Sequence, residues 1–469
     1  MDQILYWNDV ALEANRISHT DGKDVNTLGP TLSSRALAIV HLAMYDAYVG
    51  AAKATSGTSL NHYSPAAPAA AAGTSVAAAI AAAAHTALSA LYPSMKTTFD
   101  VKYAYSGATE AGTDAGFNYG VAIAKLILAD RQNDPSDSDA GYVPPIGRGK
   151  HRIDPNNAQG YNAPFYGAAS KCFSVSVRHG LDAPPAIGST EYERALKQVK
   201  VKGIAQELMG TLPSNTGKRT VDETLIGIYW GYDGAKNLGT PPRLYNLIVR
   251  KLAVENGNTL EQNAQLFAML NTAMGDAGIL AWQEKYKYNI WRPILGIREH
   301  DKSMGFTGEG NNNIDNDCDP LWLPLGAPKD ESGKKNFTPP FPAYPSGHAT
   351  FGAAAFHITR MFYGVAPNNR TADAVFNGLN FVSDEFNGIT KDNNDTTRPR
   401  HVRNFPKGLW QMIEENGFSR VYLGVHWSFD AFALDSSGKP DLSKNIGGVP
   451  LGLKIAEDIF NNKLTKSSV

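Results

Sequence analysis

The sequence predicts an all-α fold in which packed helices are joined by long loops. Hydrophobic residues make up 42% of the 469-residue chain, which is enough to form a sizeable core. Several segments place apolar residues at three- and four-residue steps, the spacing that lines one face of a helix. Alternating runs of β-branched residues, which would indicate strands, are scarce.

The expected helices follow one another along the whole chain. Residues 35–49 carry the clearest helical repeat, with Leu37 and Val40 on the buried face. The segment from Gly73 to Leu91 is nearly all alanine and lacks basic anchors on its N-terminal side, so we expect a tightly packed internal helix and no membrane span. Further helices are expected at residues 115–129, 244–254, 262–288, 350–363 and 450–460.

The chain is expected to be one integrated unit. Residues 1–215 would form mainly a helical scaffold, and residues 216–469 would carry the chemistry. Two loops, 132–167 and 301–342, are rich in Asp, Asn, Pro and Gly. Loops of this length without regular structure usually have a function, and the second one ends directly before a motif described below.

The charge balance and the chain start limit the function classes. The formal net charge is -1, which gives no overall field to attract nucleic acid or an anionic membrane. The first residues lack the basic end and apolar run of a signal peptide, so a soluble protein is expected, either cytoplasmic or released. Cys172 and Cys318 are too few for a disulfide framework or a thiolate metal cluster, although one disulfide between them stays open.

The first motif in the C-terminal half contains Lys285, Arg292 and Pro293. The two cations are seven residues apart, so both are expected to project from one helix face, about 10 Å apart along the axis. Pro293 predicts that the helix ends or kinks at Arg292. Alone, the segment is also typical of a solvated basic surface.

The second motif is Ser346-Gly347-His348, followed by an apolar helical run. Ser346 is a natural helix cap, and Gly347 permits close approach of a ligand to the backbone. A helix N-terminus offers free N–H groups to an anion, and His348 would face that anion from the first turn. An ordinary capped helix with an incidental histidine is the alternative.

The third motif contains Arg420, His426 and Asp430. Asp430 lies one helical turn beyond His426 and is expected to hold its imidazole. Arg420 and His426 are six apart, which is off-face on a regular helix, so a break near Gly424 is needed for both to reach one ligand. A buried His–Asp pair beside a surface arginine is the alternative in isolation.

Together the motifs supply three permanent cations, a hydroxyl group, a backbone N–H at a helix start and two histidines. This set is suited to neutralising a multiply charged oxyanion while leaving one imidazole as nucleophile or ligand and the other as acid or base.

In order and spacing, the three motifs resemble the signature shared by vanadium haloperoxidases and the type-2 phosphatidic-acid and acid phosphatases. The resemblance covers Lys285 to Asp430 and implies two packed four-helix-type bundles. Vanadate and phosphate are both tetrahedral oxyanions, so the signature alone does not separate the two activities.

The residues around the motifs resemble vanadium chloroperoxidases more closely. Trp282 precedes Lys285 by three residues, and Phe341 leads into the Ser346 motif; in chloroperoxidases, aromatic residues at these positions line the halide site. Residues 6–16 also look like the opening of haloperoxidase domains. The resemblance therefore implies an enzyme that uses hydrogen peroxide to oxidise chloride or bromide to hypohalous acid, with a small organic acceptor.

The resemblance also implies roles for the site residues. His426 would bond vanadium, His348 would act as acid and base, and Lys285 would polarise the peroxide. The remaining oxyanion contacts would come from Arg292, Arg420, Ser346 and the Gly347 amide. Asp430 would orient His426, and Asp222 is suggested as a salt-bridge partner of Arg420, although a helix-start carboxylate is the plainer interpretation.

Several alternatives stay open. Phosphate is expected to fit the same site, and an acid phosphatase with a phosphohistidine intermediate on His426 is the second functional hypothesis. A homo-oligomer is also left open.

The acidic segment Asp315–Asp319 alternates oxygen ligands but is expected to be a polar turn. His41 and His357 are expected in the core.

Overall fold

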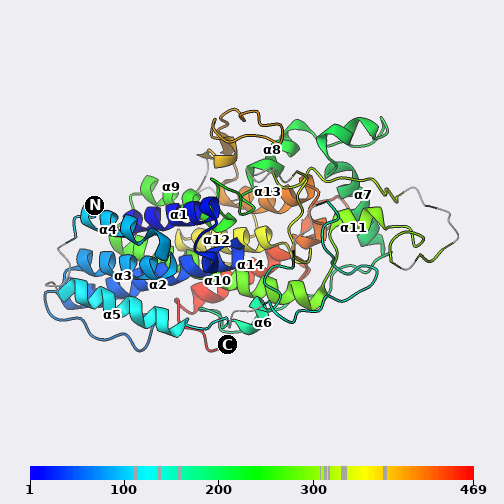
Figure 1. The fold of residues 1–469 in the computed structure, drawn as a ribbon. Coiled ribbons are helices and arrows are strands. Elements are labelled where there is room, and N and C mark those ends of the chain that lie inside the picture. Colours follow the sequence, from blue (N-terminus) through cyan, green and yellow to red (C-terminus); the bar gives the residue numbers. More distant parts are fainter. Residues whose placement is uncertain are drawn as a thin grey trace.

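The computed structural model describes residues 1–108, 115–135, 139–156, 160–306, 308–310, 314, 317–328, 335–372, 376 and 378–469. Helices dominate these residues, so the predicted all-α fold is confirmed (Figure 1). The α-helices are α1 Gln3–Asp21, α2 Gly29–Thr55, α3 Val76–Leu91, α4 Lys96–Tyr105, α5 Ala115–Asp130, α6 Tyr166–Ala169, α7 Thr190–Lys202, α8 Val221–Tyr229, α9 Pro241–Glu255, α10 Leu260–Tyr288, α11 Pro293–Arg298, α12 Gly347–Phe362, α13 Gly408–Tyr422 and α14 Gly448–Asn461. Within the described residues, the strands form two short antiparallel pairs, β1 Leu379–Phe381 with β2 Arg403–Phe405 and β3 Ala433–Leu434 with β4 Pro440–Asp441.

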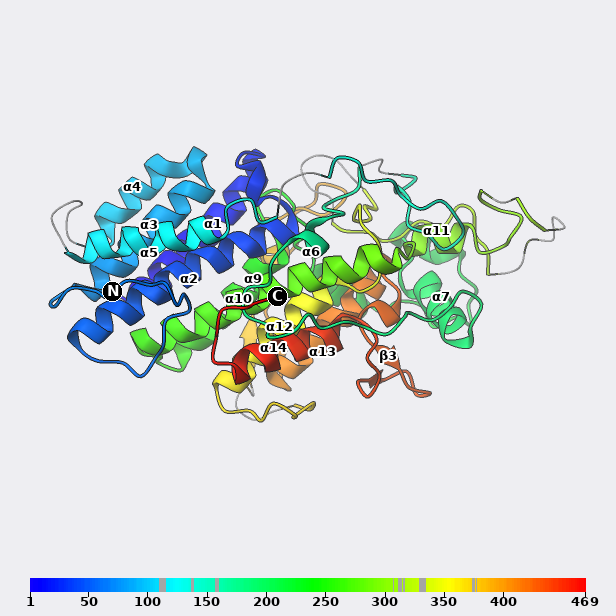
Figure 2. The same cartoon turned by 90° about the horizontal axis from the view of Figure 1, so that it is seen from below.

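The helices pack as two groups. In the first, α1, α2, α3 and α5 lie against one another; in the second, α10, α12, α13 and α14 do so. The blue and cyan helices of the first group form one end of the molecule in Figure 1, and α7 and α11 lie towards the other end. Figure 2 shows α10, α12 and α14 side by side.

Helix α10 joins the two groups. It has 29 residues and begins at a capping box in which Thr259 and Gln262 satisfy each other's backbone N–H groups. It packs against α2 in the first group and against α12 and α14 in the second. Because a helix with neighbours on several sides is buried nearly all round, its apolar residues form no single stripe. Its last turns carry Trp282 and Lys285 into the second group.

Helix α3 is the alanine-rich segment. Ala78 to Ala84 are fully buried, and the helix packs against α2 and α5, as expected of an internal helix. Among the described residues, no single helix is long and apolar enough to cross a membrane; α3 and the following Pro93–Tyr105 segment pass that test only as a pair bent by 119°.

The long loops contain no strand or long helix in their described parts. Among its described residues, the loop 301–342 forms one isolated bridge to the rest of the protein, between Ile204 and Pro324, and one within itself, between Ala327 and Phe337. Cys172 and Cys318 are free thiols, so the disulfide that the sequence left open does not form. His41 and His357 are buried, as predicted.

Candidate active site

Lys285 lies near the end of α10 with its ammonium group in the interior. The Nζ atom donates hydrogen bonds to the carbonyl oxygens of Pro342 (2.9 Å) and Ala343 (3.2 Å) and to that of Pro345. It also lies 5.1 Å from the centre of the Phe341 ring. Burial lowers the pKa of Lys285 well below its ordinary value. A neighbouring anion would favour the charged form of this side chain.

Arg292 does not share a helix face with Lys285, so that expectation is wrong. Helix α10 ends at Tyr288, and Asn289 caps it in the left-handed conformation (φ 55°). Arg292 is the N-cap residue of α11 and has an extended backbone (ψ 158°). The reason is that Pro293 disfavours helical geometry in the residue before it. The helix therefore ends earlier than predicted.

His426 is held between a carboxylate and a guanidinium group. Its Nδ1 lies 2.7 Å from Asp430 Oδ2, and its Nε2 lies 2.8 Å from Arg292 Nη1. Because a guanidinium group only donates, Nε2 is the acceptor and Nδ1 carries the proton donated to Asp430. The expected contact with Asp430 is present. Burial lowers the pKa of His426 well below its ordinary value and raises that of Asp430 to about 7.

The chain turns sharply between Arg420 and His426. Helix α13 ends at Tyr422, and Gly424 adopts a left-handed conformation (φ 73°) that favours glycine. The backbone N–H groups of Val425 and His426 both point back to the carbonyl oxygen of Arg420, at 3.1 and 3.3 Å. The predicted break near Gly424 is therefore confirmed, and it brings both functional side chains to one side.

Ser346 caps α12, as its sequence context predicts. Its hydroxyl oxygen accepts a hydrogen bond from the Ala349 N–H (3.4 Å), and its own N–H donates to the Asp430 carbonyl oxygen (2.8 Å). His348 follows in the first turn, and its Nε2 lies 2.7 Å from the Gly231 carbonyl oxygen. This contact places the ring proton on Nε2 and leaves Nδ1 as the basic nitrogen. Burial lowers the pKa of His348 to about 3.

Asp233 is the carboxylate partner of Arg420. Its oxygens lie 2.7 and 3.2 Å from the two terminal nitrogens of that guanidinium group, and one of them lies 3.8 Å from His348 Nε2. The prediction that Asp222 pairs with Arg420 is wrong. Asp222 stands in the exposed first turn of α8 and pairs with Arg403 at 2.8 Å. Asp233 escaped prediction because no motif or periodic spacing relates it to Arg420.

Residues of the second and third motifs line one cavity of about 240 Å³ together with Trp282 and Phe341. Its polar end is formed by Asp233, His348, Arg420 and His426. Trp282 and Phe341 form the neighbouring wall, and their ring centres are 4.8 Å apart. The charged groups of Lys285 and Arg292 face the Phe341 ring from 5.1 and 5.0 Å. Arg420, Gly347 and both histidines therefore line a common space, whereas Lys285, Arg292 and Ser346 are not among its lining residues.

The donors around this cavity fit a tetrahedral oxyanion. Two buried nitrogens, Arg292 Nη2 and Arg420 Nε, have no hydrogen-bond partner within the described part of the chain. Buried donors without an acceptor are costly, and an anion would satisfy them. A Cβ atom at Gly347 would lie 3.2 Å from the Trp282 ring, so glycine keeps the start of α12 accessible. The chemistry and placement of these groups suit vanadate or phosphate.

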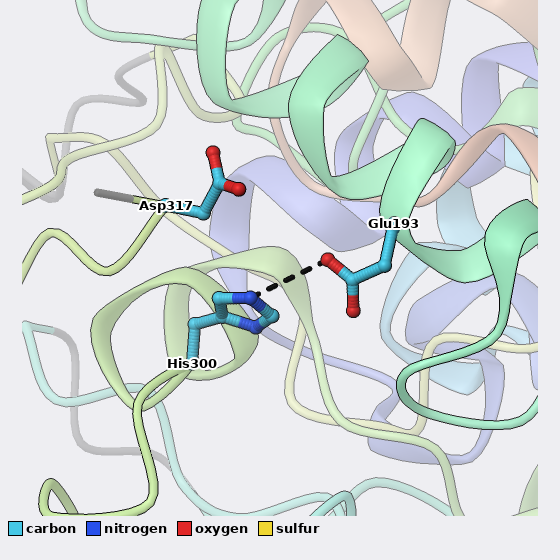
Figure 3. Close-up of side chains that lie close together, drawn as sticks. All are labelled: Glu193, His300 and Asp317. Carbon is cyan, nitrogen blue, oxygen red and sulfur yellow. Dashed lines mark ion pairs between the residues drawn. The ribbon is translucent and has the colours of Figure 1, made fainter. Parts of the chain in front are cut away.

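Glu193, His300 and Asp317 form a second group of potential metal ligands (Figure 3). None of the three lines the active-site cavity. His300 Nε2 lies 3.4 Å from Glu193 Oε2, and Asp317 Oδ2 lies 3.6 Å from Lys197 Nζ. Asp315 and Asn316, which belong to the acidic segment noted in the sequence, lie outside the described residues.

Comparison with known proteins finds relatives over nearly the whole chain. Family models described as the vanadium chloroperoxidase N-terminal domain and the VCPO second helical-bundle domain match residues 1–172 and 265–440. Vanadium chloroperoxidase from Curvularia inaequalis is 34% identical to this chain, over 98% of the chain and 90% of the relative.

Solved structures with the same fold are also found. A bacterial vanadium-dependent iodoperoxidase matches with a TM-score of 0.66 and 19% identity, covering 96% of this chain and 95% of its own. A bacterial vanadium-dependent chloroperoxidase in its apo form matches with a TM-score of 0.63 and 15% identity, covering 93% and 96%. At these identities the likeness concerns the fold alone, whereas the near-complete match to the Curvularia enzyme shows that the chain belongs to the vanadium chloroperoxidase family.

Proposed function

We propose that this protein is a vanadate-dependent haloperoxidase that uses hydrogen peroxide to oxidise chloride or bromide to hypohalous acid. The observation that carries the proposal is the cavity lined by Arg420, His348 and His426. Two buried guanidinium nitrogens beside these residues, Arg292 Nη2 and Arg420 Nε, have no acceptor in the described part of the chain, and an anion would supply one. Family membership supports the same activity.

The proposed contacts to vanadate are supported by the hydrogen bonds around His426 and by the buried arginine donors. His426 would offer the Nε2 lone pair, because its Nδ1 proton is engaged by Asp430; vanadate would then replace Arg292 Nη1, which contacts Nε2 in the structure. Arg292, Arg420, Lys285, Ser346 and the Gly347 N–H would balance the oxygens. When bound there, vanadate supplies a Lewis acid that activates peroxide towards halide without a change of metal oxidation state.

His348 is the proposed acid and base of the reaction. Its Nε2 proton is donated to the Gly231 carbonyl oxygen, so Nδ1 is the atom that takes up and returns a proton. Burial keeps the ring neutral in the absence of an anion. A bound oxyanion would raise the pKa of His348, since an opposite charge nearby favours the imidazolium form. Lys285 would polarise the peroxide.

The metal-ligand assignment is tested with His426→Ala. We expect this variant to lose tight vanadate binding and halogenation of a phenol dye by peroxide and bromide. Equilibrium dialysis measures the first property and dye bleaching the second. His401→Ala, a half-buried histidine that does not line the cavity, is the matched control and should behave like the unmodified protein. Unchanged vanadate affinity in His426→Ala would refute the assignment.

The halide preference is proposed to depend on Phe341, which packs on Trp282 beside Lys285. The substitution Phe341→His replaces the apolar ring that faces Lys285 and Arg292 with a polar ring. We expect the ratio of bromide to chloride turnover to rise. Steady-state rates with each halide measure this ratio, and an unchanged ratio would remove Phe341 from the halide site.

Phosphate is proposed to occupy the same site, since its geometry and charge suit the same donors. An acid phosphatase activity is the second candidate, because the Nε2 lone pair of His426 could attack phosphorus while His348 protonates the leaving group. Turnover of a phosphomonoester by vanadate-free protein, inhibited by vanadate, would support this activity.

A further inference from the structure

A single peptide group lies between His348 and a buried carboxylate. The peptide joins Gly231 to Tyr232 in the turn after α8. Its carbonyl oxygen lies 2.7 Å from His348 Nε2, and its N–H donates to Glu385 Oε1 at 3.1 Å. Because the C=O and N–H of a trans peptide point in opposite directions, the histidine and the carboxylate stand on opposite sides of it. A chain of hydrogen bonds therefore runs from Glu385 through the peptide to the imidazole.

The Glu385 carboxylate is buried and has a donor at each oxygen. Its Oε2 accepts from Nη1 of Arg398, also buried, at 2.6 Å, while Oε1 accepts from the Tyr232 N–H. Burial raises the pKa of Glu385, against the lowering effect of Arg398 and of the Tyr232 N–H. Donors to both oxygens favour the ionised form, so a negative charge bears on the peptide N–H.

The turn around this peptide is shaped to receive the carboxylate. Tyr232 has a left-handed backbone (φ 53°), which a residue with a Cβ atom keeps only when its surroundings hold it. Its hydroxyl oxygen accepts from the Asp384 N–H at 2.8 Å, one residue before Glu385. A Cβ atom at Gly231 would collide with Glu385 Oε1. Glycine at this position therefore permits the close contact.

A carboxylate at the N–H of a peptide changes what the carbonyl oxygen of the same peptide can do. The nitrogen, carbon and oxygen share one delocalised system, so an anion at the N–H increases the negative charge on the oxygen. The Gly231 carbonyl oxygen then accepts more strongly from His348 Nε2. A stronger acceptor at Nε2 raises the electron density at Nδ1, the nitrogen proposed to take up a proton.

Asp233 is the other carboxylate close to His348, and its role differs. One of its oxygens lies 3.8 Å from His348 Nε2, which is too long for a hydrogen bond, and both oxygens accept from Arg420. Asp233 therefore serves Arg420, whereas Glu385 serves His348. Changes at the two carboxylates should affect different properties of the site.

We propose that Glu385 is a positioning residue of the halide oxidation, which acts through the Gly231–Tyr232 peptide to orient His348 and to make its Nδ1 a stronger base. This inference rests on the haloperoxidase function proposed above. Glu385 does not line the active-site cavity, so it would touch neither peroxide nor vanadate.

The first test replaces the carboxylate with its neutral counterpart. Glu385→Gln keeps an oxygen for the Tyr232 N–H but removes the charge. We expect kcat/KM for peroxide in the vanadate-loaded enzyme to fall about tenfold, the usual difference between a charged and a neutral hydrogen bond. Vanadate affinity, measured by equilibrium dialysis, should stay unchanged, because Asp233 still holds Arg420.

The second test needs no activity and no vanadate. The Nε2 proton of His348 is followed by proton NMR and assigned by its absence from the spectrum of His348→Gln. Its resonance should move upfield in Glu385→Gln, since a weaker hydrogen bond deshields its proton less. A carboxylate that only stabilised the fold would leave this resonance where it is.

Asp134→Asn is the matched control. Asp134 is a buried carboxylate that likewise accepts from an arginine, Arg131 Nη1 at 2.9 Å, and from a backbone N–H, that of Lys171 at 2.9 Å. It does not line the active-site cavity. The control should lose thermal stability as Glu385→Gln does, and should keep the peroxide kinetics, the vanadate affinity and the His348 resonance of the unmodified protein.

A double variant covers the case in which Glu385→Gln does not fold. Its Arg398 would be a buried cation without its partner, which is strongly destabilising. Glu385→Gln combined with Arg398→Met removes both charges and leaves no buried charge unpaired. We expect the double variant to show the same upfield shift and the same loss in kcat/KM for peroxide.

The outcomes separate this inference from the proposed function. An unmoved His348 resonance, unchanged peroxide kinetics, or a loss of vanadate affinity as large as the loss of activity would overturn the role of Glu385. An upfield shift with slower peroxide kinetics and intact vanadate affinity would establish it. Absence of halide oxidation in the unmodified, vanadate-loaded protein would overturn the proposed function and, with it, the role of Glu385 in that reaction.

Discussion

At the scale of single residues, the active site depends on carboxylates that set the direction of cations and imidazoles. Asp430 fixes the tautomer of His426, and Asp233 holds both terminal nitrogens of Arg420. The motif spacing predicted the first pair, because its members lie four residues apart. It did not predict the second, because Asp233 and Arg420 are brought together only by the packing of distant segments.

Asp233→Asn should lower both vanadate affinity and halogenation, each by roughly 10–100-fold, as is usual when the partner that orients a ligand-binding group is lost. The asparagine amide can accept a hydrogen bond from one guanidinium nitrogen, but it has no negative charge and no second acceptor for the other nitrogen of Arg420. Equilibrium dialysis and steady-state rates measure the two effects. Asp222→Asn, at the exposed carboxylate that pairs with Arg403, is the control. Equal behaviour of the two variants would show that Asp233 does not position Arg420.

At the scale of elements, the apolar helical repeats predicted the long central helices. Segments 35–49, 262–288 and 350–363 lie within or nearly coincide with α2, α10 and α12. The repeat did not reveal α1, because Asn8, Asn15 and Ser18 are buried on its inner face and interrupt the apolar stripe. Buried polar residues among the apolar ones weaken the contrast on which a hydrophobic pattern depends.

The break after α13 is the element that places His426. Gly424→Ala would force a left-handed conformation on a residue with a Cβ atom, at a cost of about 1–2 kcal/mol. That Cβ atom would also lie 2.4 Å from the Gly203 carbonyl oxygen. We expect a lower thermal unfolding midpoint and weaker vanadate binding, since the turn cannot keep its shape.

Gly438→Ala provides the matched control for this change. Gly438 also has a positive φ (81°), but a Cβ atom there would meet nothing within 4 Å among the described residues. The control should lose some stability and keep its vanadate affinity. If Gly424→Ala bound vanadate as tightly as Gly438→Ala, the turn would not be needed to position His426.

At the scale of the whole molecule, the near-zero net charge conceals buried charged and titratable groups. His41 is fully buried between the Leu37 carbonyl oxygen and Asn8, and burial lowers its pKa from 6.5 to about 4. The fold therefore favours neutral His41. Its contribution to stability is complete above pH 6.5 and is lost as the pH falls towards 4.

His41→Gln should therefore flatten the pH dependence of unfolding. Between pH 6.5 and 4.5 the variant's free energy of unfolding should fall less steeply than that of the unmodified protein, by up to about 1.4 kcal/mol per pH unit. Denaturant unfolding at several pH values measures the slopes. Parallel slopes for the two proteins would mean that His41 takes up its proton in the folded state.

The central claim is that distant cations enclose one small anion with His426 Nε2 directed at it. The most direct measurement is elemental analysis for vanadium together with a crystal structure of the protein loaded with orthovanadate. We predict bound vanadium, with density for the anion within bonding distance of His426 Nε2. The anion would replace Arg292 Nη1 as the partner of that nitrogen. Vanadium absent from the protein, or bound away from a His426 that still contacts Arg292, would contradict the claim.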